Sequence, residues 1–272
     1  MYIIPQAFKD FISPDCDRAR FIQDYLKAGG LDSTIIPLQG KNHIYVKFPA
    51  QQYNPMFRIK TVIAHYDRIG IGANDNSAAV FCLMEWACSL ALPEALEGPH
   101  MLAPHNIRLI FTDGEELGQG GVEEQGAFPL AQAFRRLGIT NDDIYVFDCM
   151  GRGDVPILSQ SSIPPQVPTQ YLKNYSQLEA RARRLLQLSS PKYFCLPCSL
   201  SDNASFIANG IPAVAITMLP SGEVPLVLEG KNPPTWQSFH TPADNVDFLT
   251  PSSFEIFNRI LNNLALMKTL CP

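Results

Sequence analysis

Short apolar runs bounded by Gly, Pro, Asn and Asp alternate along the chain with longer amphipathic stretches. The apolar runs predict strands at residues 59–67, 106–112, 143–148 and 212–219. The amphipathic stretches predict helices at residues 77–91, 129–138, 175–188 and 252–268. Alternation of this kind is typical of an α/β fold with a largely parallel sheet that is covered by helices on both faces.

The N-terminal part has a different pattern. Ser13-Pro14-Asp15 predicts the start of a helix that continues through residues 17–28 and ends at Gly29-Gly30. Residues 33–39 and 43–50 predict two strands around a turn, and the Pro-rich residues 161–171 predict a surface loop. The strand–helix alternation continues on both sides of that loop, so we expect a single domain over residues 1–272.

Composition and charge narrow the function classes. The chain has 272 residues, 46% of them hydrophobic, and a formal net charge of −5. Without runs of Lys and Arg, this balance argues against nucleic acid or an anionic membrane as a partner. No apolar run is long enough to span a bilayer, and the N-terminus lacks the basic start of a signal peptide. The chain has seven Cys, an odd number, and five of them are scattered, which does not suggest a disulfide framework, so we expect a cytoplasmic location. Nothing in the sequence indicates an oligomeric state.

Polar residues gather where the predicted strands end. In an open α/β sheet, ligands bind beyond the carboxyl ends of the strands. The residues that stand there, or in the loops that follow, are His65, Asp67, Asp75, Glu115, Glu116, Asp148 and His240.

Each of these residues alone has an ordinary structural explanation. His65 could be a hydrogen-bonded residue at the end of a strand, and Asp75 or Asn76 could cap the following helix. Asp148 could belong to a turn, and His240 to a plain loop. Taken together, however, three carboxylates at one sheet edge would repel one another unless a cation balanced their charge.

Mixed imidazole and carboxylate ligands suit zinc. Two metals about 3.5–4 Å apart need one bridging carboxylate and two further ligands on each metal. Two His and three carboxylates supply that number. The adjacent acids Glu115 and Glu116 then have separate roles, because Glu116 can bind metal while Glu115 acts as the base for a water molecule. A second acid pair, Glu123-Glu124, lies well past the strand end and is expected on the solvated surface.

Six stretches together resemble the co-catalytic zinc aminopeptidases of metallopeptidase family 28. They are "AHYD", "GANDNSA", "IRLIFTDGEELG", "VFDCMG", "SDNASFIANGIPAV" and "FHTPADN", in the order and spacing of that family from about residue 60 to the C-terminus. The resemblance implies a single three-layer α/β domain, with a mixed, mostly parallel central sheet of about eight strands between helices.

The resemblance also implies two zinc ions per chain and a role for each residue. His65 and Asp148 would hold one zinc, and Glu116 and His240 the other. Asp75 would bridge the two ions. Glu115 would be the general base, and Asp67 would orient the imidazole of His65.

Two positions depart from the family pattern. The family often has "SDH" where this chain has Ser201-Asp202-Asn203, which affects substrate contacts rather than metal binding. The pair Cys195 and Cys198 precedes this motif, where some secreted relatives carry a short disulfide. No second Cys pair completes a zinc site and no thioredoxin-like context surrounds the pair, so we expect two thiols that could be oxidised.

The predicted activity is hydrolysis of the first peptide bond of a peptide with a free amino terminus. Phe206, Ile207 and Met218 could line the pocket for the first residue, although such residues are more often part of the core. A glutaminyl-peptide cyclotransferase, which shares the fold and several motifs but uses one zinc, is the alternative. A non-catalytic metal-dependent binding protein is a further alternative, against which the intact acid pair counts.

Overall fold

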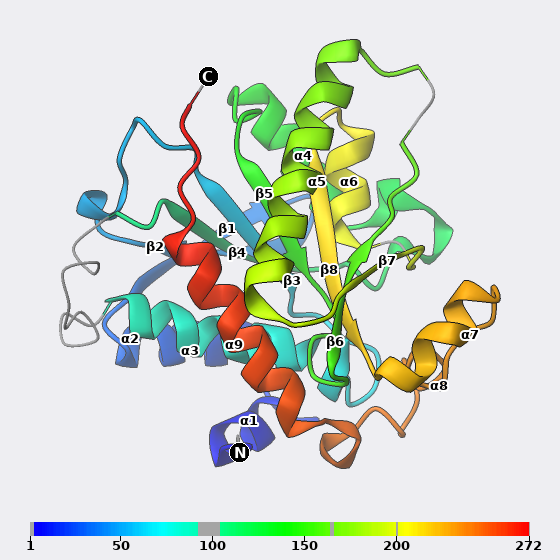
Figure 1. The fold of residues 1–272 in the computed structure, drawn as a ribbon. Helices are drawn as coiled ribbons and strands as arrows, with labels where there is room; N and C mark the ends of the chain where they lie inside the picture. Colours follow the sequence, from blue (N-terminus) through cyan, green and yellow to red (C-terminus); the bar gives the residue numbers. More distant parts are fainter. Residues whose placement is uncertain (1–2, 92–103, 164–165, 200, 272) are drawn as a thin grey trace.

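A mixed sheet forms the centre of the molecule (Figure 1). The computed structural model describes residues 3–91, 104–163, 166–199 and 201–271. Its eight strands are ordered β1-β2-β4-β3-β5-β8-β6-β7. They are β1 (Asp32–Leu38), β2 (Lys41–Lys47), β3 (Lys60–His65), β4 (Ile107–Thr112), β5 (Asp143–Phe147), β6 (Val155–Ser159), β7 (Phe194–Leu196) and β8 (Ala213–Leu219).

The centre of the sheet is parallel and its margins are mixed. The pairs β3–β4, β3–β5, β5–β8 and β6–β7 are parallel, whereas β1–β2, β2–β4 and β6–β8 are antiparallel. This arrangement confirms the predicted α/β domain with a mixed, mostly parallel sheet between helices.

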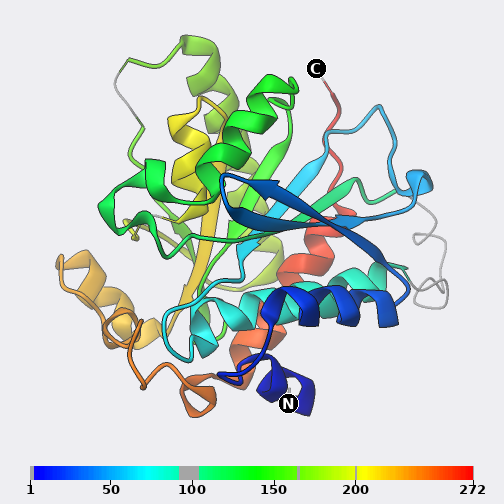
Figure 2. The ribbon, with the colours of Figure 1, turned by 180° about the vertical axis from the view of Figure 1, so that it is seen from behind.

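Helices cover both faces of the sheet. They are α1 (Gln6–Phe11), α2 (Arg18–Ala28), α3 (Ala78–Ala91), α4 (Ala127–Arg136), α5 (Thr169–Ser189), α6 (Asp202–Ala208), α7 (Val224–Leu228), α8 (Pro234–Gln237) and α9 (Pro251–Leu266). The larger core lies between the sheet and α3, α5 and α9, and a smaller one lies beneath α4 and α6, on the side seen in Figure 2. Along β4, Leu109 and Phe111 enter the larger core, while Ile110 between them enters the smaller one, as strand geometry requires.

Some sequence-based boundaries were wrong. Helix α2 begins at Arg18, where the Asp17 side chain accepts the backbone N–H of Arg20, and not at Ser13-Pro14-Asp15. The short elements α1, α6, α7, α8, β6 and β7 were not predicted, because three to seven residues are too few to show a periodic pattern. Helix α5 begins at Thr169, inside the stretch expected to be a loop, and residues 164–165 of that stretch lie outside the described residues.

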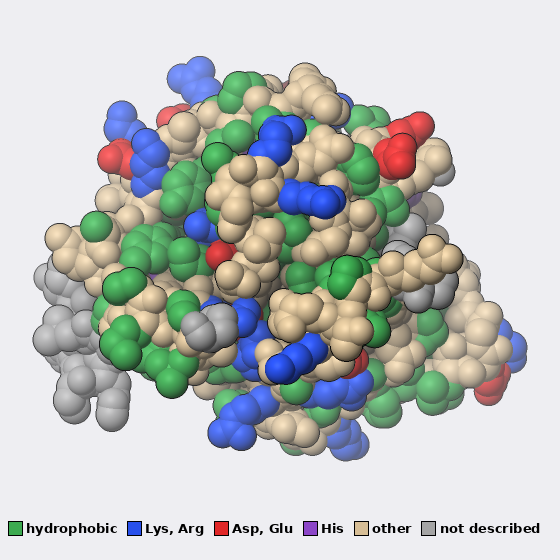
Figure 3. All heavy atoms as spheres, turned by 90° about the horizontal axis from the view of Figure 1, so that it is seen from above, with side chains coloured by type: hydrophobic (Ala, Val, Ile, Leu, Met, Phe, Trp, Pro, Cys, Tyr) green, Lys and Arg blue, Asp and Glu red, His purple; other side chains and the backbone are tan. Residues whose placement is uncertain are grey.

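The described part of the chain has no helix that is both long and apolar enough to cross a membrane. On the face shown in Figure 3, Lys and Arg side chains are dispersed among neutral and apolar ones. The parallel strands β3, β4 and β5 all end at the same edge of the sheet, and the loops that follow them carry the candidate site.

Candidate metal centre

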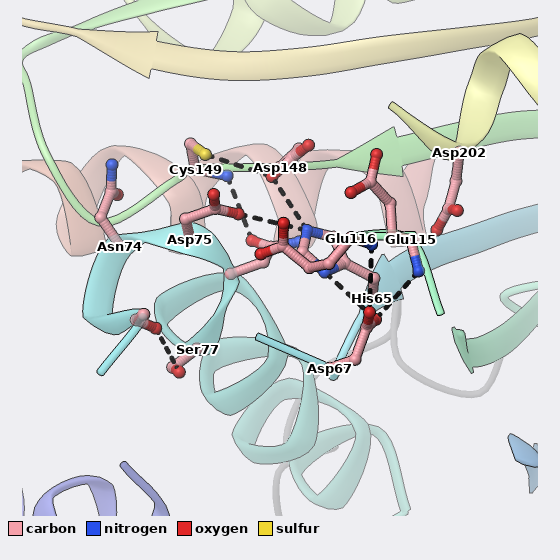
Figure 4. Close-up of polar contacts among 12 residues, drawn as sticks. His65, Asp67, Asn74, Asp75, Ser77, Glu115, Glu116, Asp148, Cys149 and Asp202 are labelled. Carbon is pink, nitrogen blue, oxygen red and sulfur yellow. Dashed lines mark hydrogen bonds and ion pairs between the residues drawn. The ribbon is translucent and has the colours of Figure 1, made fainter. Parts of the chain in front are cut away.

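His65 lies at the centre of the acidic cluster (Figure 4). It is the last residue of β3 and its side chain is 1% exposed. Its Nε2 atom lies 3.3 Å from Oδ1 of Asp75 and 3.5 Å from Oδ1 of Asp148. Its Nδ1 atom faces Oδ1 of Asp67 at 3.5 Å. Asp67 therefore has the position expected of a residue that orients the imidazole, whose other nitrogen faces two candidate ligands.

Asp75 presents its two carboxylate oxygens to two different histidines. Oδ1 faces His65, and Oδ2 lies 3.4 Å from Nε2 of His240. Burial alone would raise the pKa of Asp75, but the contacts with His240 and His65 hold that pKa below its usual value. A buried carboxylate with one oxygen directed to each side has the geometry of a bridging ligand.

Glu116 completes the cluster from the loop after β4. Its Oε2 atom lies 2.7 Å from Nε2 of His240. Its Oε1 atom and both ring nitrogens of His65 are buried, without a hydrogen-bond partner among the described residues. Ligand atoms of His65, Asp75 and Glu116 lie within 4.8 Å of one another. Buried oxygen and nitrogen atoms without a hydrogen-bond partner fit a metal ion, because they could bind it through their lone pairs.

The structure thus brings all five predicted ligands together: His65, Asp75, Glu116, Asp148 and His240. Their roles as ligands stay predictions. Cys149, which follows Asp148, also lies near the cluster, with its Sγ atom 3.2 Å from Oδ1 of Asp148.

Glu115 points away from Glu116 and has different neighbours. Its Oε1 atom accepts a hydrogen bond of 2.9 Å from Nε2 of Gln125. The Oε1 atom of Gln125 in turn accepts a hydrogen bond from the hydroxyl of Ser205. Burial and the nearby carboxylates of Asp148, Asp202 and Asp75 raise the pKa of Glu115 to about 9, although His65 acts in the opposite direction. The positive charge of a metal ion at the neighbouring candidate ligands would lower this pKa again, so that the carboxylate could accept a proton.

Asp67 has a second role that the sequence did not reveal. Its Oδ1 atom accepts the backbone N–H of Glu115, and its Oδ2 atom accepts that of Glu116, each at 3.1 Å. One carboxylate therefore holds the imidazole of His65 and the backbone of both glutamates. The "HYD" and "DGEE" stretches contain these residues, but their pairing depends on strands β3 and β4 lying side by side.

Three more residues that sequence reasoning missed hold the loop of Asp75. Asp244 accepts the backbone N–H groups of Asn74 and Asp75 at 2.7 and 3.1 Å. The side chains of Asn74 and Asn76 accept the backbone N–H groups of Gly151 and Cys149, on either side of the turn after Asp148. All three lie inside the quoted "GANDN" and "FHTPADN" stretches. Their position next to a candidate ligand was the one feature of the sequence that could have pointed to a supporting role.

Asp202 lies buried beside Glu115 and accepts a hydrogen bond from Thr112. Burial and the neighbouring Asp67 and Asp148 raise its pKa to about 7, against the opposing effects of His65 and Thr112. This carboxyl group therefore adds to the negative charge that surrounds Glu115.

The other residues singled out in the sequence have clear positions. Glu123 and Glu124 are exposed, as predicted. Phe206 and Met218 are fully buried in the cores, whereas Ile207 lines a cavity of about 210 Å³ together with Asn203 and Ser161. Cys195 and Cys198 are free thiols. Burial raises the pKa of both, to about 12 for Cys198, which opposes a role as a reactive thiolate.

Solved structures resemble this fold at low sequence identity. The LapA aminopeptidase of Legionella pneumophila is 16% identical, with a TM-score of 0.69 over 96% of this chain and 69% of LapA. A glutaminyl cyclase of Porphyromonas gingivalis is 17% identical, with a TM-score of 0.61 over 95% of this chain and 96% of the cyclase. A zinc aminopeptidase of Bacillus subtilis is 17% identical, with a TM-score of 0.51 over 82% of this chain and 49% of that enzyme.

At these identities the structural similarity supports the fold, and it does not decide between the aminopeptidases and the glutaminyl cyclase. A comparison with curated proteins finds no match. The sequence model of Peptidase family M28 matches residues 44–265, which include every candidate ligand. This chain belongs to peptidase family M28.

Proposed function

We propose that the protein is a zinc-dependent aminopeptidase that removes the first residue of peptides with a free amino terminus. The observation that carries this proposal is the arrangement around Asp75, whose two carboxylate oxygens each face a different histidine. A carboxylate placed in this way can serve two metal ions, and the remaining candidates divide evenly between its two sides. His65 and Asp148 would hold one zinc, and Glu116 and His240 the other.

Zinc at these ligands would supply a Lewis acid that polarises the scissile carbonyl and favours a water nucleophile near neutral pH. The chain's own contribution begins with Glu115. Its carboxylate would take a proton from the attacking water and give it to the leaving amine. The hydrogen bond from Gln125 fixes the position of that carboxylate, and Asp67 fixes the backbone that carries it.

The test uses metal content and a blocked substrate. Protein loaded with zinc should contain two metals per chain, and the weaker one should leave on mild chelation. Short unblocked peptides or aminoacyl amides should lose their N-terminal residue, whereas acetylated versions should not, since acetylation removes the charge and the free lone pair of the amine. Equal cleavage of acetylated peptides would contradict an aminopeptidase.

A glutaminyl-peptide cyclotransferase with one zinc is the competing function. In its favour, this chain has nearly the same extent as the glutaminyl cyclase of Porphyromonas gingivalis, of which it covers 96%. A single tightly bound zinc in an enzyme whose activity is already saturated would favour the cyclase over the peptidase.

A further inference from the structure

Two arginines join the N-terminal segment, residues 5–31, to the Asp75 loop, residues 72–77. The N-terminal segment contains α1 and α2 and lies before the part of the chain that matches the family. Arg18, the first residue of α2, reaches into the Asp75 loop, and Arg68 reaches back into the N-terminal segment. The two contacts run in opposite directions across the same interface.

Arg18 contacts the Asp75 loop through a hydroxyl group. Its Nη1 atom donates a 2.9 Å hydrogen bond to Oγ of Ser77, and that hydroxyl donates to the backbone carbonyl of Gly72. Since a guanidinium can only donate, the hydroxyl must accept from Arg18, which leaves its single proton for Gly72. Arg18 thereby fixes the direction of the hydrogen bond that closes the loop on itself, and linked hydrogen bonds of this kind strengthen one another.

The loop has little freedom to adopt another shape. Gly72 has a φ of +58°, and a Cβ atom there would lie 2.4 Å from the backbone oxygen of Asp75. The Ser77 backbone N–H also donates to the Gly72 carbonyl, at 3.2 Å. Ser77 lies on the side of the loop away from His65 (Figure 4), so it holds the loop without entering the metal centre.

Arg68 makes the reverse connection. Its guanidinium donates to the carbonyls of Ile12 and Ser13, at 2.5 and 2.7 Å, and to that of Ile71 at 3.0 Å. Ile12 and Ser13 follow the end of α1, and Ile71 directly precedes the Asp75 loop. This arginine therefore fixes the entrance of the loop against the N-terminal segment.

Arg18 is itself held in place by its surroundings. It is only 8% exposed, and its guanidinium carbon lies 4.2 Å from the centre of the Phe11 ring. Phe8, Phe11 and Tyr25 of the N-terminal segment pack against Phe81 of α3, with ring centres 5.5 to 6.5 Å apart. The nearby Arg68 repels the positive charge of Arg18, whereas the carboxylates of Asp67 and Asp75 attract it. Among the described residues the Arg18 guanidinium makes one hydrogen bond, to Ser77, while Nε and Nη2 are buried without a partner. Ser77 is therefore the contact through which Arg18 can position the loop.

We propose that Arg18 is a positioning residue for the metal centre, and that the N-terminal segment acts through it to hold Asp75 where it can bridge two metals. This inference rests on the proposed metal centre. Supporting residues around metal ligands affect metal affinity even though they do not touch the metal.

The test measures zinc affinity directly. In Arg18→Met, chelator competition at 25 °C should give a dissociation constant for the weaker zinc about 10- to 100-fold above that of the wild type. Arg18→Lys keeps the charge and one donor for Ser77, so it should recover most of the affinity. Ser77→Ala should weaken zinc in the same direction, and the double variant should lose little beyond the larger single loss, because the two residues act in one chain of hydrogen bonds.

The matched control is Arg20→Met. Arg20 lies on the same helix, its side chain is 79% exposed, and it forms an ion pair with Asp24 on the helix surface, so zinc affinity should not change. A dissociation constant for folded Arg18→Met within about 2-fold of wild type, or an equal loss in Arg20→Met, would overturn the inference. If Arg18→Met does not fold, Ser77→Ala decides by the same criterion. A wild-type protein that binds no zinc would instead overturn the proposed function and, with it, this inference.

Discussion

Replacing Asp67 by Asn tests how the acid pair is held. Asp67 accepts the backbone N–H groups of Glu115 and Glu116 with one oxygen each, and the first of these oxygens also faces Nδ1 of His65. An asparagine has one acceptor oxygen and one NH₂ group in the same space. One of the two backbone N–H groups must then face another donor, and the imidazole loses the charge that favours its orientation.

The magnitude follows from these contacts. A hydrogen bond to a charged acceptor contributes about 1.5–3 kcal/mol, and an unsatisfied buried donor costs a further 1–3 kcal/mol, part of which the loop can relieve by moving. We therefore expect Asp67→Asn to lower the free energy of unfolding by about 2–4 kcal/mol. We also expect zinc affinity to fall by about 10- to 100-fold, the usual effect of losing a residue that orients a ligand.

The assay is urea unfolding of the metal-free protein together with chelator competition for zinc. Asp113→Asn is the matched control, because Asp113 lies in the same turn and its Oδ2 atom accepts the backbone N–H of Asn42, which an amide oxygen can still do. Zinc affinity in Asp67→Asn equal to that of wild type, or a loss no larger than in Asp113→Asn, would refute the reasoning.

Three further predictions concern other parts of the molecule. Glu115→Gln should leave zinc content nearly intact while turnover falls by about 10²- to 10⁴-fold, whereas Glu116→Gln should lose metal. The reverse pattern in metal analysis and kinetics would show that the two roles are exchanged. Lys60→Met should lower the free energy of unfolding by about 2–4 kcal/mol, because the buried Lys60 ammonium donates to three backbone carbonyls at the end of α9, those of Leu264, Ala265 and Met267. An unchanged urea midpoint would contradict this role. His105 accepts the backbone N–H of Ile107, and burial, with nearby Lys60 and Lys268, lowers its pKa from 6.5 to about 3. Between these two values the unfolded chain binds the proton and the folded chain does not, so stability should decrease by about 1.4 kcal/mol for each unit by which the pH is lowered. His105→Asn should remove this part of the slope, measured by urea unfolding below a pH of about 6.

The sequence predicted the ligand set because parallel strands impose a simple rule. Residues at the carboxyl ends of β3, β4 and β5 meet at one edge, so His65, Glu116 and Asp148 could be expected together before any coordinates were known. The central strands were equally predictable, since each is an apolar run between turn residues. These features depend on local patterns and on one general property of α/β sheets.

The residues that hold the site could not be predicted in the same way. Asp244 contacts the loop of Asp75 across 169 positions of sequence, and Arg18 contacts Ser77 across 59. Such hydrogen bonds depend on how loops meet after folding, and a single polar residue in a loop gives no local pattern that identifies its partner. For the same reason, the family resemblance implied the contact of Asp67 with His65 but not its contacts with the backbone of Glu115 and Glu116.

A peptide that begins with glutamine gives the most direct test of the proposed function. The peptidase mechanism transfers a water proton through Glu115 to the leaving amine and should release free glutamine, so mass spectrometry should show loss of a whole residue. A cyclase would keep the chain length and lose only about 17 Da, the mass of ammonia. Loss of the residue, strongly slowed in Glu115→Gln, is the predicted result. Loss of ammonia alone, with no release from peptides that begin with other residues, would contradict the aminopeptidase.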